Sequence, residues 1–386
     1  MGEGGAASRA GDALSAFANA RVRPSRLDAL AELIGAEPEL GAAIPRIVEL
    51  ARRDVSPLET HLVGRAQVTT VPRSEAATWV ARMFLGAVEP PTALSPKLDL
   101  APLLGSSYPA ERAKLRCMLA YFERIVDELP AGRLRFERIV RPARTAAEWR
   151  ADRSPLLPID VRETGAIEDA HDCRQIDFAN RFLGGGVLSG GNVQEEIRFA
   201  VAPEHLVAMI VSPMMREDEA ISMHGCETFA ATRGYGGTLA YAGAWFDRAP
   251  RLADGTPDVE FVAIDAVDYR RGDPALQFAE PAVLRELGKA RAGFARDAAA
   301  RPIATGNWGC GAFCGDPPHK AILQWLAASA EGRSLRYFTF GDVRVGDLAG
   351  FAREAIARLR TVGALYERVT AVARGGAALY RTILAG

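Results

Sequence analysis

Hydrophobic residues recur at helical spacing through much of the first third of the chain. The clearest case is residues 109–129, with Pro109 in the first turn and Pro130 directly after the run. Its apolar positions, at steps of three and four, are Leu115, Met118, Leu119, Phe122, Val126 and Leu129. A second helix is predicted at 74–85, followed by a proline-rich connector over 89–109. We therefore expect residues 25–131 to form an all-helical domain.

After Gly132 the pattern changes to short β-like runs that alternate with helical ones. The predicted strands are 134–140, 175–178, 206–212, 220–224, 259–267, 302–305 and 335–340. The predicted helices are 281–297, 318–330 and 347–366. Strands interleaved with helices indicate an α/β domain with layered architecture, which we place at residues 132–386.

Composition and charge narrow the function classes. Of the 386 residues, 48% are hydrophobic and 25% charged, as in ordinary globular proteins. Because 47 basic residues balance 48 acidic ones, general binding of nucleic acid or of an anionic membrane is not expected. Five cysteines, an odd number, favour a reducing compartment, and no apolar run reaches the length of a membrane span. We expect a soluble cytoplasmic protein whose Gly/Ala-rich start, within residues 1–24, is unfolded.

Glycine is abundant, at 37 residues, and it is clustered. One cluster is Gly184–Gly186 with Gly190 and Gly191, a second spans 306–311, and a third surrounds Tyr235. Glycine lets backbone amides approach a ligand closely, and successive amides can form a nest for phosphate. Each cluster alone is also typical of a tight turn. Three clusters in one α/β domain favour a ligand that carries phosphate, although neither the P-loop pattern nor the Rossmann pattern occurs.

Glu195 and Glu196 follow the first cluster and begin a predicted helix over 193–199. Neighbouring helical side chains point about 100° apart, so this pair alone cannot flank one bond as in a two-carboxylate glycosidase. We expect one glutamate to face the bond that breaks and the other to hold a sugar hydroxyl. A helix N-terminus lowers a carboxyl pKa, whereas the adjacent carboxylate raises it, so the sign of the shift stays open. A surface charge pair at a helix start is the alternative.

The residues around this pair resemble the poly(ADP-ribose) glycohydrolase family. The chain has GGG at 184–186, a seven-residue spacer VLSGGNV, and QEE at 194–196, preceded by DFANRF at 177–182. Further blocks follow in the family's order, TGNWGCGAF at 305–313 and YFTFGD at 337–342. The likeness covers about residues 40–345 and includes 114–136, which resembles the family's join between accessory and catalytic domains.

The resemblance implies a macrodomain fold, with a mixed sheet between helices, preceded by an all-helical accessory domain. It also implies hydrolysis of the ribose–ribose O-glycosidic bonds of poly(ADP-ribose), with the polymer and ADP-ribosylated proteins as substrates. By this analogy Glu196 is the acid/base, and Glu195 holds ribose hydroxyls beside Asp177. The implied ligand-binding residues are Asn180 near the ribose, Gly184, Gly185, Gly186, Asn307, Gly309, Gly311, Ala312 and Phe313 around the diphosphate and distal ribose, and Tyr235, Phe340, Ile167, Glu168 and Gln194 around the adenine.

No metal or other cofactor is expected. Cys310, Cys314 and His319 lack the usual spacing of metal ligands and are interpreted as buried packing residues. Cys314 stands where the family pattern has glycine. The resemblance further implies a monomer with a part in reversing ADP-ribosylation after DNA damage.

Two other functions stay open at this point. The chain could bind ADP-ribose without cleaving it, as many macrodomains do, although the intact QEE block argues against this. It could also remove single ADP-ribose groups from proteins, a reaction for which this block is not needed.

Overall fold

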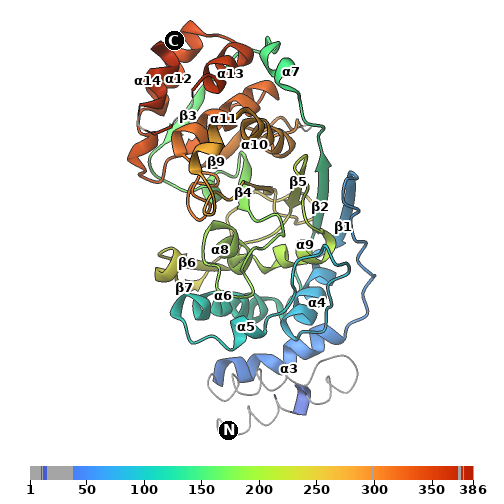
Figure 1. The fold of residues 1–386 in the computed structure, drawn as a ribbon. Coiled ribbons are helices and arrows are strands. Elements are labelled where there is room, and N and C mark those ends of the chain that lie inside the picture. Colours follow the sequence, from blue (N-terminus) through green and yellow to red (C-terminus); the bar gives the residue numbers. More distant parts are fainter. Residues whose placement is uncertain are drawn as a thin grey trace.

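The computed structural model describes residues 10, 12–14, 38–296, 299–372, 375–376 and 378–385 (Figure 1). The predicted unfolded segment 1–24 lies outside these residues, apart from Ala10 and residues 12–14, which are helical. The first part of the chain is mainly helical, and α6 begins at Pro109 as expected. Its helices are α3 (Pro38–Arg52), α4 (Arg73–Phe84), α5 (Ala101–Leu104) and α6 (Pro109–Ile125).

The expectation that this part is all-helical is wrong at β1 (Gln67–Pro72). This strand pairs antiparallel with β2 (Arg133–Val140), so that Val71 lies opposite Leu134. β1 is an edge strand with one neighbour, and the alternation of its burial is incomplete. Its pairing partner lies more than sixty residues away in the chain, beyond the reach of a local hydrophobic pattern.

Eight strands form one mixed sheet, in the order β1-β2-β5-β8-β4-β9-β10-β3. The first four pair antiparallel, and from β8 onward every neighbouring pair is parallel. A separate two-stranded hairpin consists of β6 and β7. The remaining strands are β3 (Ile159–Arg162), β4 (Arg174–Ala179), β5 (Glu219–His224), β6 (Ala230–Arg233), β7 (Ala240–Ala244), β8 (Glu260–Asp265), β9 (Ile303–Gly306) and β10 (Leu335–Phe338).

Helices cover both faces of the sheet, in agreement with the predicted layers (Figure 1). β8 shows why, because all its residues are buried and successive side chains point to opposite faces. Phe261 and Ala263 join the core with α4 and α6, and Val262 and Ile264 join the core with α10 and α11. The later helices are α7 (Ala146–Arg150), α8 (Gln194–Val201), α9 (Leu206–Val211), α10 (Glu280–Gly293), α11 (Pro317–Ala330), α12 (Leu348–Arg358), α13 (Val362–Thr370) and α14 (Leu379–Ala385).

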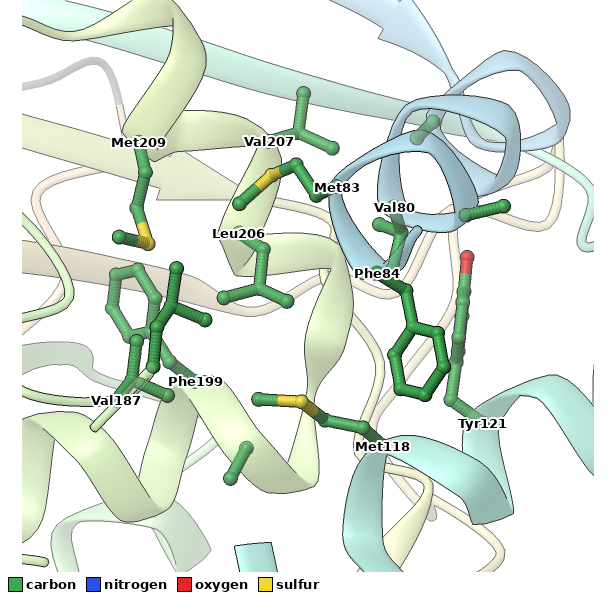
Figure 2. Packing of buried hydrophobic residues seen from close by; sticks show 14 of the residues in the cluster. Val80, Met83, Phe84, Met118, Tyr121, Val187, Phe199, Leu206, Val207 and Met209 are labelled. Carbon is green, nitrogen blue, oxygen red and sulfur yellow. The ribbon is translucent and has the colours of Figure 1, made fainter. Parts of the chain in front are cut away.

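The N-terminal helices share one hydrophobic core with the sheet domain. Figure 2 shows Met118 of α6 and Leu206 of α9 between Phe84 of α4 and Phe199 of α8. All four side chains are buried. The helical part therefore shares its hydrophobic core with the α/β part. This core includes residues of α8, the helix that begins with the QEE block.

Two predicted elements differ from the structure. The run at 206–212 is helix α9 and not a strand, because a short run that is apolar on every side fits a buried helix as well as a buried strand. The single helix predicted over 347–366 is two helices, α12 and α13. The chain turns at Arg360, which has φ of 64°, and Thr361 then caps α13 by accepting a hydrogen bond from the Ala364 amide. Among the described residues, no helix has the length and apolar character needed to cross a membrane.

Candidate active site

A large cleft lies at the carboxyl ends of β4, β9 and β10, the edge of a parallel sheet where ligands usually bind. Asn180 follows β4, Asn307 follows β9, and Phe340 follows β10. The first turn of α8 and the turn at Tyr235, between β6 and β7, complete the walls. The cavity volume is about 1510 Å³. Typical small-molecule sites have roughly 300–1,000 Å³, so this cleft has room for an elongated ligand.

The two glutamates of the QEE block are held by backbone amides of the loop between β4 and α8. Glu195 accepts hydrogen bonds from the amides of Asn180, at 2.9 Å, and Gly184, at 2.7 Å. Glu196 accepts from the amides of Gly186 and Val193, both at 2.9 Å. Each oxygen of each carboxylate thus has one amide donor and retains a further lone pair. Both glutamates line the cleft, where Glu196 is 7% exposed and Glu195 2% exposed.

These bonds correct the expected role of the three glycines. Gly184, Gly185 and Gly186 do not line the cavity, and two of their amides face the protein's own carboxylates in place of a diphosphate. Gly185 has φ of 49°, and a Cβ there would lie 2.8 Å from an oxygen of Glu195 and still closer to Glu196. The loop needs glycine because the backbone approaches both carboxylates so closely.

Asp177 lies on β4 and is fully buried. It does not line the cleft, so direct contact with a ligand, as expected of a catalytic residue, is not what the structure shows. Among the described residues neither carboxyl oxygen has a hydrogen-bond partner. Burial and the negative charge of Glu196 raise the pKa of Asp177 well above its ordinary value, and this favours the protonated acid.

Burial also raises the pKa of Glu195, and the nearby charges of Asp177 and Glu196 add to the effect. The amide hydrogen bonds from Asn180 and Gly184 act in the opposite direction. The sign that the sequence left open is therefore upward for Glu195. A raised pKa keeps the carboxyl group protonated to higher pH, and in that form it can donate a hydrogen bond to a sugar oxygen.

Two of the residues expected around the adenine have other roles. Ile167 is fully buried in a small core with Cys173 and Phe338 and does not reach the cleft. Gln194 lines the cleft, but its carboxamide is engaged within the protein. Its Oε1 accepts from the Phe178 amide at 2.8 Å, and its Nε2 donates to the Ile176 carbonyl and to Glu168. Gln194 thereby ties α8 to β4, and its donors are not available to read a base.

Glu168, Tyr235 and Phe340 all line the cleft as expected. Tyr235 is 57% exposed and Phe340 50% exposed, high values for aromatic side chains. The Tyr235 hydroxyl accepts a hydrogen bond from the Gln194 amide at 3.2 Å, so the ring is held at the start of α8. Phe340 has φ of 52° and stacks on Phe338 with the ring centres 6.3 Å apart.

The loop after β9 presents unused amides to the cleft. Among the described residues, the backbone N–H groups of Gly311, Ala312 and Phe313 donate to no protein acceptor. All three residues line the cavity, as do Gly309 and Asn307. Asn307 anchors the loop to β10 by accepting from the Tyr337 hydroxyl at 2.8 Å and donating to the Thr339 carbonyl. Consecutive free amides at a cleft wall can bind an anion.

Sequence reasoning missed several polar groups of the site. Arg270 and Arg344 line the cleft near this loop, and the Arg270 guanidinium lies over the Phe313 ring at 5.6 Å. Lys114 of α6 donates a hydrogen bond to the Gly186 carbonyl of the β4–α8 loop. The signal for Lys114 was present in the sequence, because it stands four residues before Met118 and eight before Phe122 on the apolar stripe of its helix.

Cys310, Cys314 and His319 lie in different surroundings. Cys310 is buried, and burial raises its pKa to about 12. Cys314 is exposed, which corrects its interpretation as a buried packing residue, and its φ of 58° suits the glycine of the related pattern. His319 is buried against Phe278. Within the described part of the chain, no three His, Cys, Asp or Glu side chains are grouped as metal ligands.

Comparison with known families agrees with this arrangement. Residues 146–347 match the poly(ADP-ribose) glycohydrolase family with macro domain fold, and residues 38–138 match the helical domain of the same family. The chain belongs to the poly(ADP-ribose) glycohydrolase family. The predicted macrodomain-type sheet preceded by a helical domain is thereby confirmed, with β1 as the exception described above. The predicted boundary at residues 131 and 132 stays a prediction.

Related proteins resemble most of this chain. Poly(ADP-ribose) glycohydrolase 1 of Caenorhabditis elegans is 33% identical over 366 residues, which cover 88% of this chain and 45% of that protein. Poly(ADP-ribose) glycohydrolase 2 of the same organism is 33% identical, over 82% of this chain and 67% of that protein. Probable poly(ADP-ribose) glycohydrolase 2 of Arabidopsis thaliana is 32% identical, over 66% and 58%. The chain thus spans about half to two thirds of the length of these relatives.

Proposed function

We propose that this chain hydrolyses the ribose–ribose O-glycosidic bonds of poly(ADP-ribose) and releases ADP-ribose. Family membership supports the substrate class, since the related proteins are named for this activity. The observation that carries the proposal is the position of Glu196. Its carboxylate lies at the wall of an elongated cleft, held by two amides, in the same cavity as a loop with three unused amides.

In this proposal the diphosphate binds the amides of Gly311, Ala312 and Phe313. Arg270 and Arg344 line the same cleft, where each guanidinium is paired with a carboxylate, that of Asp268 and that of Asp342. The exposed rings of Tyr235 and Phe340 provide flat apolar surfaces for the adenine, and base–aromatic stacking contributes about 1–3 kcal/mol per base. These contacts orient the ligand without a metal ion in the mechanism.

The distal ribose then lies beside Asn180 and the two glutamates. The Asn180 Oδ1 accepts from the Phe182 amide at 3.0 Å, while its Nδ2 has no protein acceptor in the described part of the chain and can donate to a ribose hydroxyl. Glu195, with its raised pKa, is suited to hold a second hydroxyl. Asn180 directly follows β4, and Glu195 precedes Glu196 in the first turn of α8.

Glu196 acts as the acid and then the base. As the bond from the anomeric carbon to the departing ribose oxygen breaks, Glu196 gives that oxygen its proton. The resulting carboxylate stabilises the oxocarbenium-like centre and accepts a proton from the water that attacks the anomeric carbon. The two amides hold the carboxylate in one orientation throughout both steps, so little reorganisation is needed.

The test compares wild type with Glu196→Gln by measuring free ADP-ribose released from the polymer and ADP-ribose binding by calorimetry. Loss of a general acid lowers the rate by about 10²–10⁴-fold, and we expect binding to be nearly unchanged. Glu168→Gln is the matched control, since Glu168 lines the same cleft and lies against Gln194, outside the amide bonds that hold Glu196; it should raise KM and leave kcat nearly intact. If wild type binds ADP-ribose but neither protein releases product, the chain is a binding module and the proposal is wrong.

Four further predictions from the sequence accompany this proposal. They are a cytoplasmic location, a monomeric state, no direct binding of nucleic acid, and a part in reversing ADP-ribosylation after DNA damage. Comparing polymer with singly modified protein as substrate distinguishes this activity from removal of single ADP-ribose groups.

A further inference from the structure

Lys114 connects the helical domain to the loop that carries the candidate catalytic residues. It lies on α6 and is fully buried. Its ammonium donates to three carbonyl oxygens of the β4–α8 loop, those of Gly186 at 3.1 Å, Ser189 at 2.6 Å, and Gly191. An ammonium has three donors, and here each has an acceptor from one short segment.

A buried charge needs such partners. Burial lowers the pKa of Lys114 to about 8, and the negative charges of Glu196 and Glu111 oppose this shift. Below that pH the side chain is charged and can make all three bonds. The segment from Gly186 to Gly191 is thus folded around a cation that belongs to another domain.

The same segment determines where Glu196 lies. Gly186 accepts from Lys114 with its carbonyl and donates to Glu196 with its amide. Gly191 also accepts from Lys114, and a Cβ at Gly191 would lie 2.5 Å from the Oε1 of Glu196. Both glycines that contact Lys114 in this way therefore border the carboxylate, so displacement of either moves the surroundings of Glu196.

α6 also packs against the β6–β7 hairpin, which carries Tyr235 of the cleft. Ala110 and Ala113 form a small core with Leu239, against which Ile197 of α8 and Tyr241 of β7 pack. Leu239 lies four residues after Tyr235, and Figure 1 shows α6 beside α8 and the β6–β7 hairpin. One face of α6 thus contacts both the α8 side and the hairpin side of the cleft.

We propose that Lys114 is a positioning residue, through which the helical domain completes the β4–α8 loop and holds Glu196 in its reactive orientation. This inference rests on the proposed function. It assigns the helical domain a direct part in the chemistry, acting through the loop rather than through contact with the substrate.

The test uses Lys114→Met, which keeps the length of the side chain and removes the charge and the donors, in the full chain. We expect kcat on the polymer to fall about 10²-fold, the effect of a displacement near 1 Å, with ADP-ribose affinity little changed. The control is Lys289→Met, because Lys289 is also fully buried and also donates to carbonyls, those of Arg216 and Glu219, outside this loop. Melting temperatures are measured for each protein.

A chemical rescue separates positioning from general stability. In Lys114→Ala the missing side chain leaves space, and added propylamine should restore a large part of kcat. In Lys114→Met the space is filled, so propylamine should have no effect, and neither should propanol in either variant. Restoration of kcat by the amine in the alanine variant alone is the expected result.

Several results would overturn the inference. These are a kcat of Lys114→Met close to that of wild type, an equal fall in Lys289→Met at a similar melting temperature, or no rescue of Lys114→Ala. Failure of both Lys114 variants to fold, even with propylamine, would show that the residue holds the fold instead. If wild type itself releases no ADP-ribose, it is the proposed function that fails, and the two failures are thereby distinguished.

Discussion

Two glycine-rich loops border the cleft, one after β4 and one after β9, and their backbone amides face different acceptors. In the first, the amides of Gly184 and Gly186 donate to Glu195 and Glu196. In the second, the amides of residues 311–313 donate to no group in the described part of the protein. A glycine-rich loop can thus use its amides for carboxylates of the protein itself, as the first loop does with Glu195 and Glu196.

The two loops also differ in how they are supported. The first is folded around the Lys114 ammonium and packed over Met209, whose Sδ would lie 2.6 Å from a Cβ at Gly184. Figure 2 places Met209 near Phe199 in the shared core. The second is anchored mainly by Asn307 and leaves its tip exposed. The amides of the first loop are therefore already occupied by the protein's own carboxylates, whereas the second loop has the free amides that the proposed function assigns to a ligand.

The largest effect is expected when a methyl group is added to the first loop. The same change in the second loop provides the comparison. In Gly191→Ala the new Cβ would lie 2.5 Å from Glu196 and 2.8 Å from the Gly186 Cα, so the carboxylate or the loop must move. We expect kcat to fall about 10²-fold. In Gly311→Ala the new Cβ meets nothing within 4 Å, so we expect an unchanged melting temperature and an effect on KM only. Equal losses of kcat in the two variants would show that the loops do not differ as described.

A smaller effect should follow from removing charge beside the second loop. Arg270 lies over Phe313, and Arg270→Gln should weaken ADP-ribose binding about two- to fivefold, as for an exposed charge. The weakening should shrink as salt concentration rises, because salt screens exposed charges. Arg271→Gln is the control, since the neighbouring arginine does not line the cleft. Calorimetry at two salt concentrations gives both values, and a larger loss in the control would contradict the assignment.

The last prediction concerns stability instead of activity, and the buried acid behind the first loop. Because burial and Glu196 raise the pKa of Asp177, the folded protein keeps this proton where the unfolded chain has lost it. Wild type should then lose stability as pH rises above about 4, by up to about 1.4 kcal/mol per pH unit within the window between the two pKa values. Asp177→Asn has no ionisable group at this position, so its free energy of unfolding should not show this decrease with pH.

The free energy of unfolding of Asp177→Asn should accordingly improve relative to wild type as pH rises above about 4. Denaturant titrations at a series of pH values measure this difference. Part of the rise in the pKa of Glu195 comes from Asp177, so the difference between the two proteins reports both carboxyl groups together. A difference that is constant with pH would mean that Asp177 ionises normally in the folded protein.

Local patterns determined much of the architecture. The stripe from Leu115 to Phe122 predicted α6, and the alternation of strands with helices after Gly132 predicted a layered α/β domain. The same patterns could not separate the buried helix α9 from a strand, and they could not reveal β1, whose stability comes from pairing with β2. Short apolar segments carry too little periodicity to decide their own conformation.

The candidate site likewise has a part that the sequence suggested and a part that only the tertiary structure revealed. The glycine clusters and the resemblance of their surroundings to one family made Glu195, Glu196, Tyr235 and the loop at 307–313 candidates from the sequence, and in the structure residues of all of these segments line one cleft. Only the tertiary structure showed that Asp177 and Ile167 are buried away from the cleft, and that Lys114 holds the loop beside Glu196. The reason is physical: the partner of a backbone amide or a buried charge is whichever group the fold brings within about 3 Å, and that group can be far away in the chain.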